Sequence, residues 1–176
     1  MKRPRSAIIV AAFAIGMLAT PVTAQQASET DATVVVLVRH AERQDSDGDD
    51  PGLSPAGEER AATLAHVLSH LDVDAIYTSQ FRRTRETAVP LASATGLTPE
   101  VVDARDMPAL LERVRGGPHR TIVVIGHSNT VPAIARALGA PAVGDISEGT
   151  YDDMLVVRLA GDVATLMHFK YGRPTP

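Results

Sequence analysis

The sequence predicts an α/β protein with three layers, in which helices cover both faces of a mostly parallel central sheet. Residues 33–38 (TVVVLV) and 121–125 (TIVVI) are continuous β-branched runs, typical of strands that are buried on both faces. Segments with helical spacing of apolar residues lie between the predicted strands. Strands that alternate with helices favour an α/β/α sandwich, and no internal repeat or second domain is evident.

The N-terminus has the pattern of a secretory signal peptide. Three basic residues among the first five precede an apolar run at 7–19, and residues 22–24 (VTA) supply the small side chains that a signal peptidase needs. The run is shorter than the roughly 20 residues that span a bilayer, so an uncleaved anchor is the weaker alternative. We therefore expect cleavage after Ala24 and a periplasmic or secreted protein.

Cleavage would leave residues 25–32 as a flexible segment and residues 33–176 as one folded domain. The chain has 17 basic and 21 acidic residues, and removing residues 1–24 takes away three basic ones, which leaves a formal charge of −7. This charge argues against nucleic acid as a partner, and against a membrane once the signal peptide is gone. There is no cysteine, which excludes disulfides and thiolate metal sites.

The first strand is followed by a predicted surface loop and a helix. Residues 39–53 are polar and contain glycine and proline, which favours a loop. Ser54 and Pro55 have the residue types preferred at an N-cap and at the first helical position. The apolar spacing predicts a core face made by Leu64, Val67, Leu68 and Leu71.

Shorter elements follow in order. Residues 74–78 are a predicted strand, and a helical pattern covers residues 81–96, which Pro90 should kink or interrupt. Residues 100–102 are the third predicted strand, and Asp106 can cap a short helix after it.

The last elements are a helix and a hairpin. Residues 129–138 are a predicted helix with Gly139 as its stop signal. Residues 154–159 and 163–169 are predicted to pair as a hairpin, with the turn at residues 161–162.

Each of the two most buried predicted strands leads into a histidine. The first strand ends at Arg39 and His40, and the strand at 121–125 ends at Gly126 and His127. In open α/β sheets, ligands bind beyond the carboxyl ends of the strands. The two histidines are 87 residues apart in the sequence, yet they would meet if the two strands are neighbours.

Four segments follow one another in a recognisable order: residues 39–42 (RHAE), 53–57 (LSPAG), 79–88 (SQFRRTRETA) and 126–129 (GHSN). They resemble the R-H-[GA]-E, L-[ST]-x-x-G, S-x-x-x-R-[AT]-x-[QE]-T-A and G-H-[ST] motifs of the histidine phosphatase superfamily (branch 1). The resemblance covers residues 33–138 and implies a phosphoglycerate mutase-like fold.

The resemblance also implies roles for individual residues. His40 and His127 are the expected catalytic residues, with His40 attacking phosphorus, and Arg39, Arg83 and His127 are expected to bind the phosphoryl oxygens. Arginine offers a fork of donors that suits phosphate, and the two arginines disfavour protonation of His40. Because arginines would carry the charge, no metal and no cofactor is expected.

The choice of Arg83 over its neighbours Arg82 and Arg85 rests on register. Arg83 lies four residues after Ser79 and four before Thr87, as the family motif requires.

The group that would protonate the leaving group stays open. Members of the family commonly place a carboxylate between the second and third sheet segments. The candidates in this sequence are Glu42, Glu100, Asp103, Asp106 and Glu148.

Two other functions fit parts of the pattern. A phospholigand-binding pseudoenzyme would keep the same histidines and arginines but lack an acid. A serine esterase would use Ser128, although its G-x-S-x-G motif is broken by Thr130. His66 and His70 have an H-x-x-x-H spacing but fall opposite the apolar helix face, so we predict a solvated surface there rather than zinc.

A phosphomonoester hydrolase is expected rather than a mutase. Residues 97–120 leave little chain for a lid that would exclude water. The expected substrate is a small phosphorylated molecule or a phosphorylated protein side chain. The sequence does not decide between them, and it does not indicate an oligomeric state.

Overall fold

The computed structural model describes residues 32–45, 48–117, 120–141 and 143–176. The expected signal peptide (1–24) and residues 25–31 of the expected flexible segment lie outside the described residues. Among the helices that are described, none is long and apolar enough to cross a membrane.

The central sheet has six strands in the order β3-β2-β4-β1-β5-β6. The first four strands run parallel, and the last two form an antiparallel hairpin that pairs with β1. The bounds are β1 Thr33–Arg39, β2 Ala75–Thr78, β3 Glu100–Val101, β4 Thr121–Gly126, β5 Asp153–Ala160 and β6 Val163–Lys170. The prediction of a mostly parallel sheet is confirmed.

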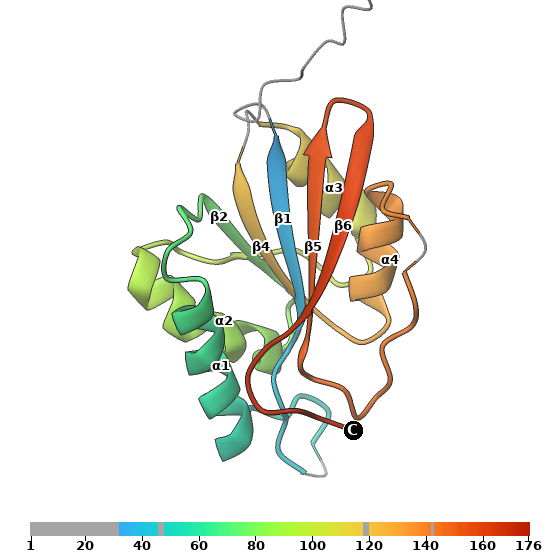
Figure 1. Ribbon diagram of the computed structural model, residues 1–176. Coiled ribbons are helices and arrows are strands. Elements are labelled where there is room, and N and C mark those ends of the chain that lie inside the picture. The colour runs from blue at the N-terminus through green and yellow to red at the C-terminus, as the bar shows by residue number, and fades with distance from the viewer. Residues whose placement is uncertain (1–31, 46–47, 118–119, 142) are drawn as a thin grey trace, which may run out of the picture.

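Helices cover both faces of the sheet, as Figure 1 shows. The helix bounds are α1 Pro55–Val67, α2 Arg82–Thr95, α3 Met107–Arg115 and α4 Thr130–Ala137. One apolar cluster joins the sheet to α1 and α2, and a second joins its other face to α3 and α4. The predicted three-layer α/β/α sandwich is therefore confirmed.

The predicted helix signals act as expected. Ser54 Oγ accepts a hydrogen bond from Gly57 N at 3.2 Å, and Asp106 Oδ1 accepts one from Ala109 N at 3.1 Å. Gly96 ends α2 with φ 72°, a left-handed conformation that glycine adopts without a Cβ clash.

Parts of two expectations about the helices were wrong. Val67 and Leu71, predicted to face the core, are 47% and 43% exposed. Val67 lies off the buried stripe of α1, which includes Ala61, Leu64 and Ala65, and Leu71 lies beyond the end of the helix. Pro90 does not interrupt α2, which continues to Thr95.

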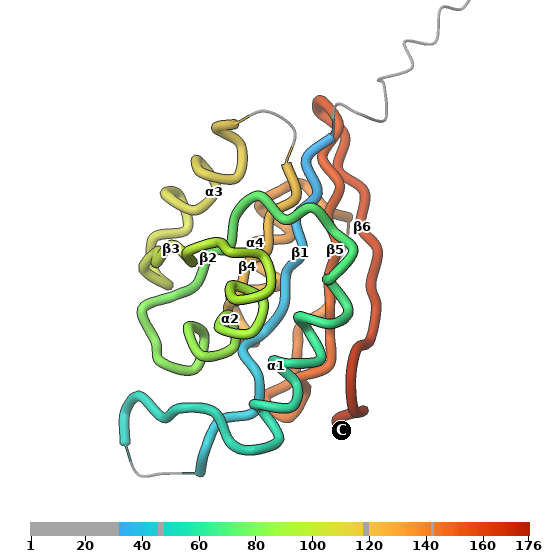
Figure 2. Tube along the Cα trace, turned by 90° about the vertical axis from the view of Figure 1, so that its left-hand side faces the viewer, coloured from blue at the N-terminus to red at the C-terminus, as the bar shows by residue number. Residues whose placement is uncertain are grey.

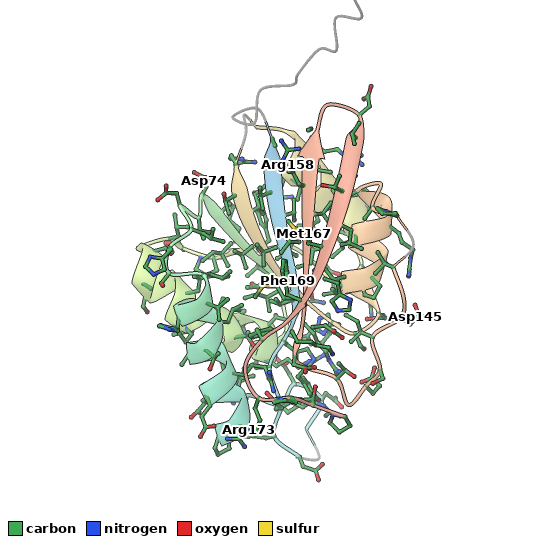
Figure 3. All side chains as sticks on the ribbon, in the orientation of Figure 1. Asp74, Asp145, Arg158, Met167, Phe169 and Arg173 are labelled. Atoms are coloured by element: carbon green, nitrogen blue, oxygen red, sulfur yellow. The ribbon has the colours of Figure 1, made fainter. Side chains whose placement is uncertain are left out.

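The hairpin of β5 and β6 forms one edge of the sheet and extends beyond the helices. Figure 3 shows Met167 and Phe169 on β6, where they are 47% and 48% exposed. At the opposite end of the molecule, Arg173 Nη2 contacts Glu59 of α1 at 3.0 Å. The C-terminal segment therefore returns to α1 at the end of the sheet where β1 finishes (Figures 1 and 2).

Candidate active site

The carboxyl ends of β1 and β4 bring the two predicted histidines together. Arg39 pairs with Gly126 in the sheet, and His40 N donates to Gly126 O at 2.9 Å. The rings of His40 and His127 lie 5.3 Å apart between centroids. They line a cavity of about 560 Å³ together with Arg39 and Arg83, so all four residues expected from the sequence meet at one place.

His40 is held with one ring nitrogen free. Its Nδ1 lies 2.8 Å from the carbonyl oxygen of Ala41, and because a carbonyl can only accept, Nδ1 carries the proton. Nε2 has no hydrogen-bond partner in the part of the chain that the structure describes, so its lone pair is available for nucleophilic attack. Burial, with the charges of Arg39 and Arg83 adding to it, lowers the pKa of His40 to about 3, so the imidazole stays neutral.

His127 is also neutral, and its tautomer follows from its neighbours. Arg83 Nη2 lies 3.5 Å from Nδ1, and a guanidinium can only donate, so Nδ1 accepts. Nε2–H then donates to Ser79 Oγ at 3.0 Å, and Ser79 in turn contacts Thr84 Oγ1. Burial first, and Arg83 second, lower the pKa of His127 to about 4. A bound phosphoryl group would raise this pKa and favour a proton on Nδ1.

Arg39 is buried and is oriented by the backbone. Its Nη1 donates to the carbonyl oxygens of Ser147, Glu148 and Thr150 at 3.0, 2.6 and 3.0 Å. The guanidinium lies 4.1 Å from the centre of the Tyr151 ring. Nε is buried and has no hydrogen-bond partner among the described residues.

Arg83 points from the start of α2 toward the same cavity. Its guanidinium lies 4.4 Å from the Phe81 ring, and Nη1 is 3.7 Å from Asp50 Oδ1. Arg82 instead pairs with Glu86 on the surface at 2.6 Å, and Arg85 is exposed. The geometry thus favours the register that singles out Arg83.

Two of the five candidate acids are distant from this chemistry. Glu42 forms a bidentate ion pair with the buried Arg60, in which Arg60 Nη2 lies 2.7 Å from Glu42 Oε1. Arg60 also donates a hydrogen bond to Tyr171 O. Glu100 lies on the outer strand β3 and contacts Arg113 at 3.6 Å.

The other three candidates lie closer, but each is already hydrogen-bonded. Asp103 Oδ1 accepts from Arg105 N at 2.8 Å, and Asp106 caps α3. Of the five, only Glu148 lines the cavity, where it accepts from Ser128 Oγ at 2.6 Å. That hydrogen bond, followed by the charge of Arg39, lowers the pKa of Glu148 and favours its carboxylate form.

The sequence did not indicate several side chains that shape the site. Tyr151 packs on Arg39, and its ring centroid is 5.9 Å from that of His40. Phe81 packs edge-on against His127 at 5.2 Å. Only Ser79 carried a signal, because it belongs to the motif at 79–88. The loop at 147–151 carried none.

His66 and His70, which shared a metal-like spacing, are exposed on and beyond α1. Within the described parts of the chain, no group of three or more His, Asp or Glu side chains is arranged to hold a metal ion.

Comparison with known sequences supports the resemblance. The sequence model of the histidine phosphatase superfamily (branch 1) matches residues 35–105, which include three of the four motifs. PE-PGRS family protein PE_PGRS11 from Mycobacterium tuberculosis (strain ATCC 25618 / H37Rv) is 33% identical over 106 residues, or 58% of this chain. The match spans 17% of that protein's length.

Comparison with solved structures supports the fold. The protein histidine phosphatase SixA in complex with tungstate is 19% identical, with a TM-score of 0.65 over 78% of this chain and 97% of that one. A mycobacterial glucosyl-3-phosphoglycerate phosphatase is 20% identical, with a TM-score of 0.57 over 72% and 90%. A candidate phosphohistidine phosphatase SixA from Nakamurella multipartitia is 27% identical, with a TM-score of 0.56 over 81% and 96%. Sequence motifs, family match and architecture agree: the chain resembles the histidine phosphatase superfamily (branch 1) and has the phosphoglycerate mutase-like fold.

Proposed function

We propose that this protein is a phosphatase that hydrolyses phosphomonoesters through a phosphohistidine intermediate on His40. The observation that carries the proposal is a buried, neutral His40 with a free Nε2 lone pair, facing a cavity that Arg39, Arg83 and His127 also line. The match of residues 35–105 to the sequence model of the histidine phosphatase superfamily supports the same activity.

The reaction would proceed in two displacements. Nε2 of His40 attacks phosphorus, the P–O bond of the ester breaks, and the leaving oxygen takes up a proton. Water then attacks the phosphohistidine, the P–N bond breaks, and dihydrogen phosphate leaves while the imidazole returns to its neutral state. Arg39, Arg83 and His127 would stabilise the charge on the phosphoryl oxygens in both steps.

A labelling experiment tests this proposal and separates it from a pseudoenzyme. The wild-type protein should turn over p-nitrophenyl phosphate and form an adduct that is labile in acid and stable in alkali. His40→Asn should lose both. A binding protein without turnover would fail the first assay, and an adduct that persists in His40→Asn would place the nucleophile elsewhere.

The serine esterase alternative has less support. An esterase serine needs a histidine to accept its proton. Ser128 Oγ donates to the Glu148 carboxylate instead.

We also propose that the protein acts without a divalent metal and outside the cytoplasm. Arginines supply the positive charge that metal ions provide in many phosphoryl-transfer enzymes. Activity should therefore persist in a chelator, and restoration by one specific metal after loss would contradict this. Export after cleavage at Ala24 predicts a mature protein that begins at Gln25 by mass spectrometry, and a full-length cytoplasmic protein would contradict it.

Hydrolysis is proposed rather than phosphoryl transfer between hydroxyl groups. The cavity is open to solvent, so water is the available acceptor. Interconversion of 2- and 3-phosphoglycerate without release of phosphate would show that the protein is a mutase.

A phosphorylated protein side chain is a second candidate substrate, and the state of the carboxylates favours it. Glu148, the one candidate acid that lines the cavity, is favoured as a carboxylate and cannot donate a proton in that form. An alkoxide leaving group needs that proton, whereas the imidazole released from phosphohistidine is far less basic. Faster release of phosphate from a phosphohistidine-containing protein than from sugar phosphates would favour this substrate. The reverse order would favour small esters.

A further inference from the structure

The loop at residues 143–152, between α4 and β5, orients Arg39 but contains no helix or strand. Three of its carbonyl oxygens accept from Arg39 Nη1, and the ring of Tyr151 packs on the guanidinium. Inside the loop, Thr150 N donates to Ser147 O at 3.1 Å, which closes one turn. A segment without regular secondary structure depends on outside contacts for a fixed position. The orientation of Arg39 therefore depends on what holds this loop.

Residues 171–176, which follow β6 and lie outside the cavity, contact this loop. Thr150 Oγ1 donates to Pro176 O at 3.0 Å, and Tyr151 N donates to Thr175 Oγ1 at 3.0 Å. Figure 1 shows the segment crossing the end of the sheet where β1 finishes. Both links use donors of the loop, so its carbonyl oxygens remain available to accept from Arg39.

Asp152 fixes the direction of the Thr175 hydroxyl group. Asp152 is buried, and its Oδ1 lies 2.6 Å from Thr175 Oγ1 and 3.0 Å from Lys170 Nζ. Burial alone would raise the pKa of this carboxyl, but the hydrogen bonds from Thr175 and Lys170 lower it to about 2. A carboxylate can only accept, so the hydroxyl proton points to Asp152 and the hydroxyl oxygen accepts from Tyr151 N. A side chain without a hydroxyl group could not serve both partners.

The segment that carries Thr175 is itself anchored to the rest of the domain. Tyr171 N donates to Asp152 O at 2.9 Å. The buried Arg60 of α1 donates to Tyr171 O at 2.9 Å and to Arg173 O at 2.8 Å. Thr175 thus connects a segment that α1 holds to the loop that orients Arg39.

We propose that Thr175 is a positioning residue for the phosphoryl-binding site. Its hydroxyl group joins Asp152 to Tyr151 and so fixes the loop whose carbonyl oxygens orient Arg39. Thr175 lies outside the cavity and acts through Arg39 rather than on the substrate. The inference rests on the proposed function for the role of Arg39. Its size follows from geometry, because a displacement of about 1 Å at a group that stabilises the reaction can cost ~10²-fold in rate.

Thr175→Val tests this role, because it keeps the shape of the side chain and removes the hydroxyl group. It should lower kcat for p-nitrophenyl phosphate and the affinity for tungstate, measured by calorimetry, by about 10-fold or more each. Thr175→Ser keeps the hydroxyl group and should bring both values close to those of wild type. Thr165→Val makes the same change at an exposed threonine of β6 and should alter neither value.

Thermal unfolding of each variant separates positioning from stability, with all assays run well below the unfolding temperature. A lower unfolding temperature in Thr175→Val with an unchanged kcat and tungstate affinity would overturn the proposal. An equal loss in Thr175→Ser would also overturn it, because the hydroxyl group would then not be the cause. If Thr175→Val does not fold, the smaller Thr175→Ala removes the same hydroxyl group and is held to the same outcomes.

A double-mutant cycle shows whether Thr175 acts through Arg39. In an Arg39→Gln background, Thr175→Val should cause little further loss of tungstate affinity, because the guanidinium that it positions is gone. A further loss as large as in the wild-type background would overturn the proposal.

The tungstate titrations also separate this inference from the proposed function. If no phosphate ester is hydrolysed, the phosphatase proposal fails, while the loss of tungstate affinity in Thr175→Val and its rescue in Thr175→Ser still decide whether Thr175 positions Arg39. A wild-type protein that neither hydrolyses an ester nor binds tungstate would overturn both proposals.

Discussion

Replacing His40 by asparagine tests the electrostatic basis of the site through folding stability. His40 is 3% exposed, and burial lowers its pKa from the ordinary value of 6.5 to about 3 in the folded protein. Between these two values, the unfolded chain binds a proton that the folded protein does not bind. The free energy of unfolding should therefore fall as the pH is lowered from 6.5 toward 3.

The size of the effect follows from the width of this window. Each pH unit inside it changes the free energy of unfolding by ~1.4 kcal/mol. Lowering the pH from about 7 to about 5 crosses roughly 1.5 units below the unfolded pKa, so His40 alone should remove about 2 kcal/mol. His127, whose pKa is also lowered, acts in the same direction.

Urea denaturation at about pH 7 and about pH 5, in buffers without phosphate, measures this difference. The wild-type protein should lose about 2 kcal/mol more than His40→Asn over this interval. His66→Asn, which removes an exposed histidine from α1, should behave as wild type. An identical pH dependence in wild type and His40→Asn would refute the argument that burial keeps His40 neutral.

Three further substitutions test other parts of the site. Arg83→Ala should lower kcat by ~10³-fold or more, which is the scale known for arginines that contact a transferred phosphoryl group. Arg85→Ala should have a mild effect. Equal effects of the two substitutions would show that the motif was aligned with the wrong arginine. Ser79→Ala removes the hydrogen-bond acceptor of the buried His127 Nε2–H, and a buried donor without a partner costs ~1–3 kcal/mol. The free energy of unfolding should therefore fall, and kcat should drop by about 10-fold. An unchanged kcat would show that this tautomer of His127 is not needed. Glu42→Gln should destabilise the fold by about 3 kcal/mol because it breaks a largely buried ion pair with Arg60. The kcat of the folded protein should change little. A large loss in kcat without a loss in stability would identify Glu42 as the acid that protonates the leaving group.

Much of the fold could be predicted because its signals are local. Continuous β-branched runs marked β1 and β4, and the residue types at Ser54 and Asp106 marked helix starts that the structure confirms. The error at Leu71 has a physical cause. Apolar spacing identifies a helix face, but where the helix ends decides which side chains reach the sheet, and α1 ends before Leu71.

The residues of the candidate site that follow the ends of strands could be predicted from the sequence. The contacts that they make with residues far away in the sequence could not. His40 and His127 follow buried strands, and a parallel sheet brings such ends together. Tyr151 and the carbonyl groups at 147–150 reach Arg39 from more than 100 residues away. A backbone carbonyl has no residue type, so no sequence pattern could have identified these partners of Arg39.

The way in which Arg39 is held explains how the site can be both buried and positively charged. A buried guanidinium must have hydrogen-bond partners, and a carboxylate partner would cancel much of the charge that a phosphoryl group needs. Three backbone carbonyl groups meet the first demand without cancelling the charge. Glu148, which does carry a charge, has a side chain that is 86% exposed, so water screens its effect on Arg39. The remaining positive charge disfavours protonation of both histidines, and the interaction that we propose to bind the phosphoryl group would thereby keep His40 nucleophilic.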